Sequence, residues 1–309
     1  LPSELSRSKL DNFYKKVSPL HRKLKDSILG VEEVVFDFEN CSYVTPSGAC
    51  ALLIERDLLI SNDIPVFVSA GGKNRVLQFA KALGLPIGDK NESLQSAYQR
   101  RMGGRSTPIT KCLSYDECLE CHEEITDTII SKVDCSKGTE AAIDYMIGEI
   151  WDNAGVHGYE CYQEDKYPMP VYIGAFNYKS KVEVVVADRG QGIHDSLRKN
   201  NSDFRNLNAK EAIQTALDNE ASGHPENSPG FGLYCTSQFV YENGGQLSLW
   251  SSGRSLKIDG NGNLQTYGSD HEIGTLVGFE INAEVNIPFE QIVKRSGSAE
   301  EYLELINGY

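Results

Sequence analysis

The ten residues from Glu149 to Gly158 carry side chains whose types and spacing could form a ligand site. They read E-I-W-D-N-A-G-V-H-G and follow a run of apolar residues at helical spacing. Four-residue spacing places Glu149, Asn153 and His157 on one face of that predicted helix. A carboxylate, an amide and an imidazole beside small residues suit a site that a ligand approaches closely. A solvated polar face of a helix would show the same pattern, so the motif needs support from the rest of the chain.

An acidic turn with two glycines follows a predicted strand. The strand, residues 181–187, leads into Asp188-Arg189-Gly190-Gln191-Gly192-Ile193. The glycines let the backbone turn tightly and would let a flat ligand lie against it. An ordinary hairpin turn gives the same D-x-G-x-G pattern.

A second glycine segment, Ser228-Pro229-Gly230-Phe231-Gly232-Leu233, opens a predicted helix from Leu233 to about Glu242. Backbone N–H groups converge at such a helix start, and the helix dipole favours an anion such as phosphate there. Asn243-Gly244-Gly245 should end this helix. Farther on, Gly274-Thr275 opens a predicted strand that runs to residue 281.

The elements that would position these residues follow from apolar periodicity. Around the motifs the pattern predicts helices over 114–132, 138–155 and 209–217, and strands over 170–177, 181–187 and 246–251. The N-terminal third alternates helices and strands, which indicates a small α/β layer. Its predicted elements are helices over 10–28, 49–60 and 76–83, strands over 34–38 and 65–68, and a turn over 43–48. Residues 86–110 are turn-rich and predict a linker.

Composition limits the function classes. A length of 309 residues suggests two domains, and no apolar run approaches a membrane span or a signal peptide. Residues 1–110 carry 15 basic and 12 acidic side chains, whereas residues 111–309 carry 15 and 32. An acidic protein has no general attraction for nucleic acid, so a DNA or RNA binder is disfavoured. Eight cysteines in a chain of this length indicate reduced thiols and a cytoplasmic protein.

One cluster of cysteines has a spacing that two interpretations explain, a haem or metal site and the apolar side of a helix. Cys118-Leu-Glu-Cys121-His122 matches the pattern of covalent haem attachment, and Cys112 could add a zinc ligand. The alternative is a helical apolar stripe with acidic residues outside it. That stripe comprises Leu113, Cys118, Cys121, Ile125, Ile129 and Ile130. The stripe is the preferred interpretation, because haem attachment requires export and nothing here signals export.

The order of the motifs carries more information than each motif alone. An E-x-x-x-N helix, D-x-G-x-G after a strand, G-x-G-L opening a helix and G-T opening a strand follow one another over residues 138–283. This series resembles the GHKL ATP-binding fold of gyrase, large heat-shock chaperones, histidine kinases, mismatch-repair ATPases and anti-sigma serine kinases. The resemblance implies ATP and Mg²⁺ as cofactors.

The resemblance also assigns roles to residues. It implies that Asn153 binds Mg²⁺, that Asp188 accepts a hydrogen bond from adenine with support from Thr275, and that residues 194–229 form a lid. Glu149 stands where hydrolytic members keep a general base, and His157 is the next candidate. The residues expected to bind the nucleotide are Asn153, Asp188, Gly190, Gly192, Ile193, Gly230, Phe231, Gly232, Leu233 and Thr275. Ser228 stands where many kinases have a first glycine.

The N-terminal pattern from Val34 to Leu85 resembles a STAS domain, the fold of anti-anti-sigma factors and transporter tails. The likeness consists of a strand, a turn, a long helix, a strand and a helix that ends at Gly84-Leu85. Pro46 stands at the family's phosphorylated serine, and Ser47 matches the residue after it, so phosphorylation of the usual kind is not expected. A purely structural cap would account for the same pattern.

The sequence therefore predicts a STAS-like α/β domain over 1–100, a linker and helix over 101–137, a GHKL α/β sandwich over 138–285 and a tail over 286–309. Asn153-Ala154-x-x-His157-Gly158 looks most like the anti-sigma serine kinases. The expected function is a regulatory protein that binds Mg-ATP and either hydrolyses it slowly or phosphorylates a protein serine. The alternative is a non-catalytic, nucleotide-gated binding module. A protein partner is expected, homodimer formation is left open, and neither nucleic acid nor membrane is expected as a partner.

Overall fold

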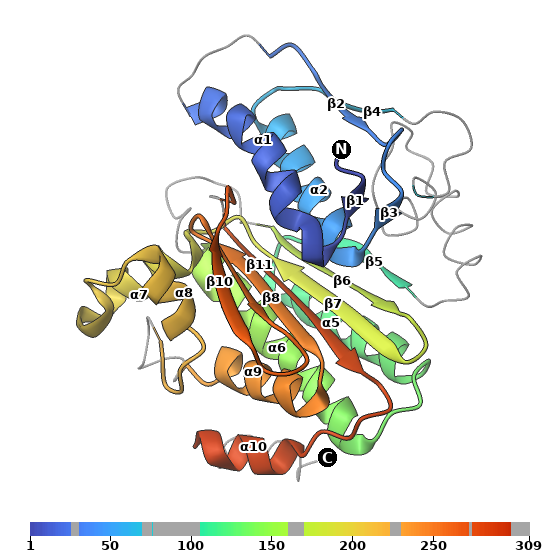
Figure 1. Ribbon diagram of the computed structural model, residues 1–309, viewed down its shortest axis with the longest axis vertical. Coiled ribbons are helices and arrows are strands. Elements are labelled where there is room, and N and C mark those ends of the chain that lie inside the picture. Colours follow the sequence, from blue (N-terminus) through green and yellow to red (C-terminus); the bar gives the residue numbers. More distant parts are fainter. Residues whose placement is uncertain are drawn as a thin grey trace.

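A computed structural model describes residues 1–25, 31–69, 76, 106–159, 170–222, 230–271 and 274–297. The fold is mixed α and β, built around a seven-stranded sheet (Figure 1). The strand order is β10-β9-β8-β11-β7-β6-β5, and all neighbours in it are antiparallel. The strands are β5 (Ser106–Cys112), β6 (Val171–Asn177), β7 (Lys181–Ala187), β8 (Gln246–Ser251), β9 (Arg254–Ile258), β10 (Leu264–Gly268) and β11 (Thr275–Asn282).

The sheet is apolar on both faces. Along β7, Val182, Val184 and Val186 join one core, whereas Val185 and Ala187 join another. Side chains of a strand alternate between faces, so this near-continuous apolar run predicts a sheet that is covered on both sides. The strands predicted over 170–177, 181–187, 246–251 and 274–281 are confirmed by β6, β7, β8 and β11.

Helices cover the first face. They are α5 (Tyr115–Ile130), α6 (Lys137–Tyr159) and α9 (Gly232–Asn243), and α10 (Phe289–Ser296) packs against α9 and α6. Helix α9 ends at Gly244, which adopts a left-handed conformation with φ of 64°, as the Asn-Gly-Gly sequence predicts. Helix α10 lies in the segment predicted as a tail and packs on α9, with Phe289 stacked on Phe239 at 5.4 Å between ring centroids.

Two short helices lie between β7 and α9. They are α7 (Gly192–Asn200) and α8 (Ala209–Thr215), joined through the 3₁₀ turn η3 (Ser202–Phe204). Helix α8 is predicted by the sequence, whereas α7 is missed. The apolar side of α7 is short and includes Leu197, which packs with Ala212 and Ala216 of the α8 region.

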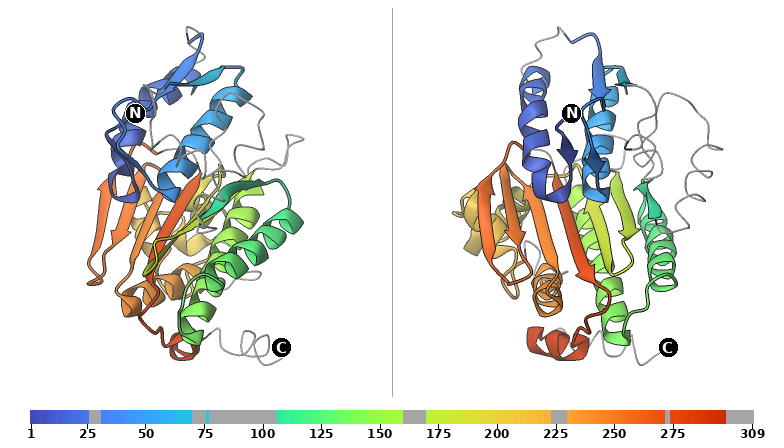
Figure 2. Two further views of the ribbon diagram at one scale, coloured as in Figure 1. Left: turned by 90° about the vertical axis from the view of Figure 1, so that its right-hand side faces the viewer. Right: turned by 45° about the vertical axis from the view of Figure 1, so that its right-hand side comes forward.

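The N-terminal segment forms a layer on the second face of the sheet (Figure 2). Its helices are η1 (Arg7–Lys9), α1 (Leu10–Lys25) and α2 (Pro46–Ser61). Its parallel strand pairs are β1 (Glu4–Leu5) with β3 (Tyr43–Val44), and β2 (Val34–Asp37) with β4 (Val66–Ser69). The turn predicted over 43–48 is wrong in part, because Thr45 caps α2 and Pro46 occupies its first turn.

This N-terminal layer is joined to the sheet by buried polar contacts as well as apolar ones. The hydroxyl of Ser47, at the start of α2, donates to Glu183 Oε1 of β7 at 2.8 Å. Arg7 lies 3.5 Å from the carboxylate of Glu280 on β11. The sheet residues that share a core with the layer are Ile109, Tyr172, Phe176, Val185, Ala187, Trp250 and Leu276. The two predicted domains therefore bury their apolar surfaces against each other.

Residues 106–112, which the sequence assigns to linker, form β5 at one edge of the sheet. The segment pairs with β6, and Thr107 exchanges hydrogen bonds with the backbone of Ala175. Polar threonines and Pro108 conceal this strand in the sequence. The predicted helix over 76–83 and its Gly84-Leu85 end lie outside the described residues, apart from Val76. Within the described ranges, no helix is long and apolar enough to cross a membrane.

Candidate functional site

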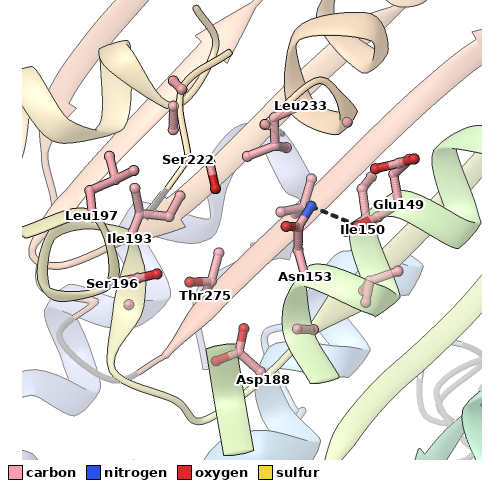
Figure 3. Close-up of a pocket in the computed structure, with 18 residues that line it drawn as sticks. Glu149, Ile150, Asn153, Asp188, Ile193, Ser196, Leu197, Ser222, Leu233 and Thr275 are labelled. Atoms are coloured by element: carbon pink, nitrogen blue, oxygen red, sulfur yellow. Dashed lines mark hydrogen bonds between the residues drawn. The ribbon is translucent and has the colours of Figure 1, made fainter. Parts of the chain in front are cut away.

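A pocket lies between α6, α7, the start of α9 and the ends of β7 and β11 (Figure 3). The empty space inside it, open solvent at its mouth included, is about 840 Å³. Its lining includes nine residues that the sequence singles out: Glu149, Asn153, Asp188, Gly192, Ile193, Gly230, Gly232, Leu233 and Thr275. Motifs that are far apart in the chain therefore meet at one cavity.

Helix α6 contributes the carboxylate and the amide. Glu149 and Asn153 are one helical turn apart, and the Asn153 Nδ2 donates to the Glu149 carbonyl oxygen at 2.7 Å. That bond occupies the amide nitrogen, and Figure 3 shows the amide oxygen on the other side of the group. His157 lies two turns beyond Glu149 in the same helix, but its side chain is outside the described residues.

The Glu149 carboxylate is in an environment that favours its protonated form. Burial raises the pKa of Glu149 to about 7, the charge of Asp152 adds to the rise, and a hydrogen bond with Tyr145 opposes it. The carboxylate also lies so close to the backbone of Gly232 that a Cβ added there would overlap it. A carboxylate with a pKa near neutrality can accept a proton efficiently at physiological pH.

The acidic glycine turn leaves the end of β7 and enters α7 directly, instead of forming a hairpin. Asp188 is buried, and its Oδ1 accepts a hydrogen bond from the Gly190 N–H at 2.6 Å. Burial raises the pKa of Asp188 to about 7. Gly192 adopts a φ of 76° at the start of α7, a conformation that favours glycine. Gly190 shapes this turn through its backbone but is absent from the residues that line the pocket.

The start of β11 lies against this turn. The Asp188 N–H donates to the Thr275 carbonyl oxygen at 2.9 Å, and the Thr275 side chain faces the pocket. Gly274 has a φ of 68°, and a Cβ on it would come within 2.0 Å of the Asp188 carbonyl oxygen. Glycine is required at this position because the two backbones approach so closely.

The fourth wall is the start of α9. Its N-cap is Phe231, whose side chain makes no capping hydrogen bond to the first N–H groups of the helix. Gly230 has a φ of 84° and packs against Ala221. Gly232 and Leu233 line the pocket, whereas Phe231 packs against the core between the sheet and the helices on its first face. Ser228 lies outside the described residues.

Several lining residues lie outside the motifs recognised in the sequence. Ser196 and Leu197 come from α7, and Ala216, Ala221 and Ser222 come from the segment after α8. The amphipathic spacing of Ile193, Ser196 and Leu197 could have indicated the two α7 residues, whereas the segment after α8 carries no such signal. No lysine or arginine lines the pocket in the part of the chain that the structure describes.

The cysteine cluster has a packing role. Cys112, Cys118 and Cys121 are buried in the main core together with Ile125 and Ile129, which confirms most of the predicted apolar stripe. The prediction is wrong for Leu113, which precedes α5 and is exposed. The ring of His122 contacts Asp144 and Trp151 instead. Among the described residues, no group of three or more His, Cys, Asp or Glu side chains could hold a metal ion.

The residues present fit ATP and Mg²⁺. The buried Asp188 carboxylate can accept from an amino group on a flat base, and the uncapped start of α9 can receive phosphate. One amide oxygen, that of Asn153, suits a Mg²⁺ ion that keeps its waters and its phosphate ligands. Such an ion needs no cluster of protein carboxylates, and among the described residues there is none.

A scan against protein-family models gives no match to this chain, and a search of the curated proteins also gives none.

Proposed function

We propose that this protein is a regulatory protein of the GHKL type that binds Mg-ATP and turns it over slowly, by hydrolysis or by transfer to a protein serine. The observation that carries the proposal is the meeting of four separated motifs at one pocket. Glu149 and Asn153, the Asp188 turn, the Gly230–Gly232 helix start and Thr275 all line it. In this proposal the N-terminal layer is a STAS-like domain.

Each part of the pocket then has one task. Asp188 would hold the adenine amino group, and the glycine turn would let the base lie close. Mg²⁺, when bound, would neutralise phosphate charge in a pocket whose described lining has no basic side chain. Asn153 would orient that ion through its amide oxygen. The N–H groups at the start of α9 would hold the phosphate oxygens.

Glu149 would act as the general base. Its carboxylate lies beside the start of α9, so it is next to the place proposed for the phosphates. With its pKa at about 7, the ionised base becomes available as the pH rises through neutrality. Turnover should therefore rise between about pH 6 and pH 8.

The second candidate is a non-catalytic binding module gated by nucleotide. The burial of Ser47 against Glu183 favours it over a kinase that phosphorylates its own N-terminal layer. In that case the nucleotide would act only by changing the arrangement of α7 and α8 for a protein partner.

Glu149→Gln distinguishes the two candidates. Glutamine keeps the size of the side chain but cannot take a proton, so Mg-ATP should still stabilise the variant in a thermal-shift assay. Turnover should fall by about 10²- to 10⁴-fold if Glu149 is the base. Asp152→Asn is the matched control, because it removes a neighbouring charge of α6 that does not line the pocket. It should keep its turnover and shift the pH profile to lower pH.

The other outcomes are equally informative. Stabilisation by Mg-ATP without turnover in the wild type would support the binding module. Normal hydrolysis in Glu149→Gln would move the base elsewhere, with His157 next to be tested. A wild-type protein that Mg-ATP does not stabilise would refute the proposed function.

A further inference from the structure

The carboxylate of Asp11, in α1 of the N-terminal layer, binds the β8–β9 hairpin of the sheet. Its Oδ1 accepts from the Trp250 Nε1 at 2.9 Å. Its Oδ2 accepts from the Ser255 hydroxyl at 3.3 Å and from the Lys257 ammonium at 3.2 Å. Trp250 is completely buried, so its indole N–H depends on this carboxylate. One side chain of α1 thus binds both strands of the hairpin, Trp250 on β8 and Ser255 and Lys257 on β9.

The next two residues of the hairpin hold the wall of the pocket. The Ser251 hydroxyl accepts from the Ile193 N–H at 2.9 Å, and the Ser252 hydroxyl accepts from the His194 N–H at 3.3 Å. These two N–H groups belong to the first turn of α7. The Ser251 hydroxyl also donates to the Gly274 carbonyl oxygen at 3.2 Å and lies 3.2 Å from the Thr275 hydroxyl. Ile193 and Thr275 both line the pocket.

A second contact of α1 reaches the same region. The ring of Tyr14 packs on the ring of His271, with 4.4 Å between centroids, and both residues are buried. The His271 carbonyl oxygen accepts from the Gly253 N–H at 2.8 Å, which ties the segment after β10 to the turn of the hairpin. Helix α1 therefore supports the base side of the pocket at two points.

We propose that α1 positions the base-binding wall of the nucleotide site, with Asp11 as the principal positioning residue, and that nucleotide binding and α1 docking stabilise each other. The proposal rests on the proposed function, since it takes the pocket ligand to be an adenine nucleotide. Coupling of this kind is reciprocal in free energy. A ligand that orders Thr275 and the start of α7 also orders the hairpin, and through it α1. The N-terminal layer would in this way sense whether nucleotide is bound.

The test compares Asp11→Ala with Arg7→Ala in the full chain. Both variants remove a charged side chain of the N-terminal layer that binds the sheet. Arg7 binds Gln246 and Glu280, at the ends of β8 and β11 away from the pocket. Asp11→Ala should weaken the binding of Mg-ATP, ADP and AMP by the same factor, about 5-fold or more, and Arg7→Ala should not weaken it.

Hydrogen exchange separates a local effect from a general loss of stability, because it measures the exchange rates of individual backbone amides. In nucleotide-free protein, the amides of Ile193 and His194 should exchange faster in Asp11→Ala and at the wild-type rate in Arg7→Ala. Asp11→Asn, which keeps one acceptor for Trp250, serves as a milder variant that should fold even if the alanine variant does not. Its affinity should lie between those of the wild type and Asp11→Ala.

Nucleotide binding by the wild type and by the variants distinguishes a failed positioning role from the absence of a nucleotide site. If the wild type binds nucleotide and both Asp11 variants bind it with the wild-type affinity, the positioning role is refuted. An equal loss of affinity in Arg7→Ala would also refute it, because any loosening of the N-terminal layer would then suffice. If the wild type binds no adenine nucleotide, the proposed function fails, and with it the reciprocal coupling.

Discussion

Replacing Asp188 with asparagine should make the free protein more stable at alkaline pH and remove its affinity for adenine nucleotides. Asp188 is buried, and its pKa is raised from an ordinary 3.8 to about 7 because burial disfavours the charged form. In the folded protein the group therefore binds a proton more tightly than in the unfolded chain. Stability from this group is greatest at low pH and falls as the pH rises from about 4 to about 7.

The magnitude follows from the difference in pKa. A rise of about three pKa units corresponds to a cost of about 4 kcal/mol once the pH exceeds 7. Asparagine carries no charge and avoids that cost, while its amide oxygen can still accept from the Gly190 N–H. Asp188→Asn should therefore be more stable than the wild type by up to about 4 kcal/mol at pH 8. At pH 4 the two proteins should be nearly equal.

Urea unfolding at pH 4, 6 and 8 measures this difference, and thermal shifts with Mg-ATP measure binding in the same samples. Mg-ATP at about a hundredfold above its Kd should stabilise the wild type by about 2.7 kcal/mol and the variant by little. Asp195→Asn, on the exposed side of α7, is the matched control and should show neither effect. A stability difference that does not change with pH would refute the reasoning about Asp188, and an unchanged Mg-ATP shift would refute its contact with adenine.

Three further outcomes are expected. Asn153→Ala should bind nucleotide in the absence of metal, but Mg²⁺ should no longer increase its affinity. Titration calorimetry with and without Mg²⁺ measures this, and an increase equal to that of the wild type would contradict it. Ser47 should remain unphosphorylated after long incubation with Mg-ATP, because its buried hydroxyl already donates to Glu183. Intact-mass spectrometry measures this, and stoichiometric phosphate would instead support a kinase that phosphorylates itself. Gly274→Ala should lower the free energy of unfolding by at least about 1–3 kcal/mol, because its φ of 68° and the nearby Asp188 carbonyl oxygen leave no room for a Cβ. Denaturant unfolding measures this, and a stability equal to that of the wild type would show that the close approach is absent.

Residue patterns alone predict most of the helices and strands that surround the pocket and many of the residues that line it. Apolar periodicity predicted α6, β6, β7 and β8 within a few residues, because each has a buried face of regular spacing. The glycines at 192, 230 and 274 were recognisable since each sits where a strand or helix starts. Their left-handed φ angles give the physical reason for their identity.

The contacts between these elements cannot be predicted from residue patterns. Strand β5 was hidden because its burial comes from pairing with β6 and not from an apolar pattern of its own. Helix α7 was missed for a related reason, since the hydroxyls of Ser251 and Ser252 hold its first turn from a segment almost sixty residues away. The docking of α1 through Asp11 and of α2 through Ser47 likewise depends on partners more than a hundred residues distant along the chain. Contacts of such separation leave no periodic signal, because they are set by how complete elements pack and not by the spacing of residues within one element.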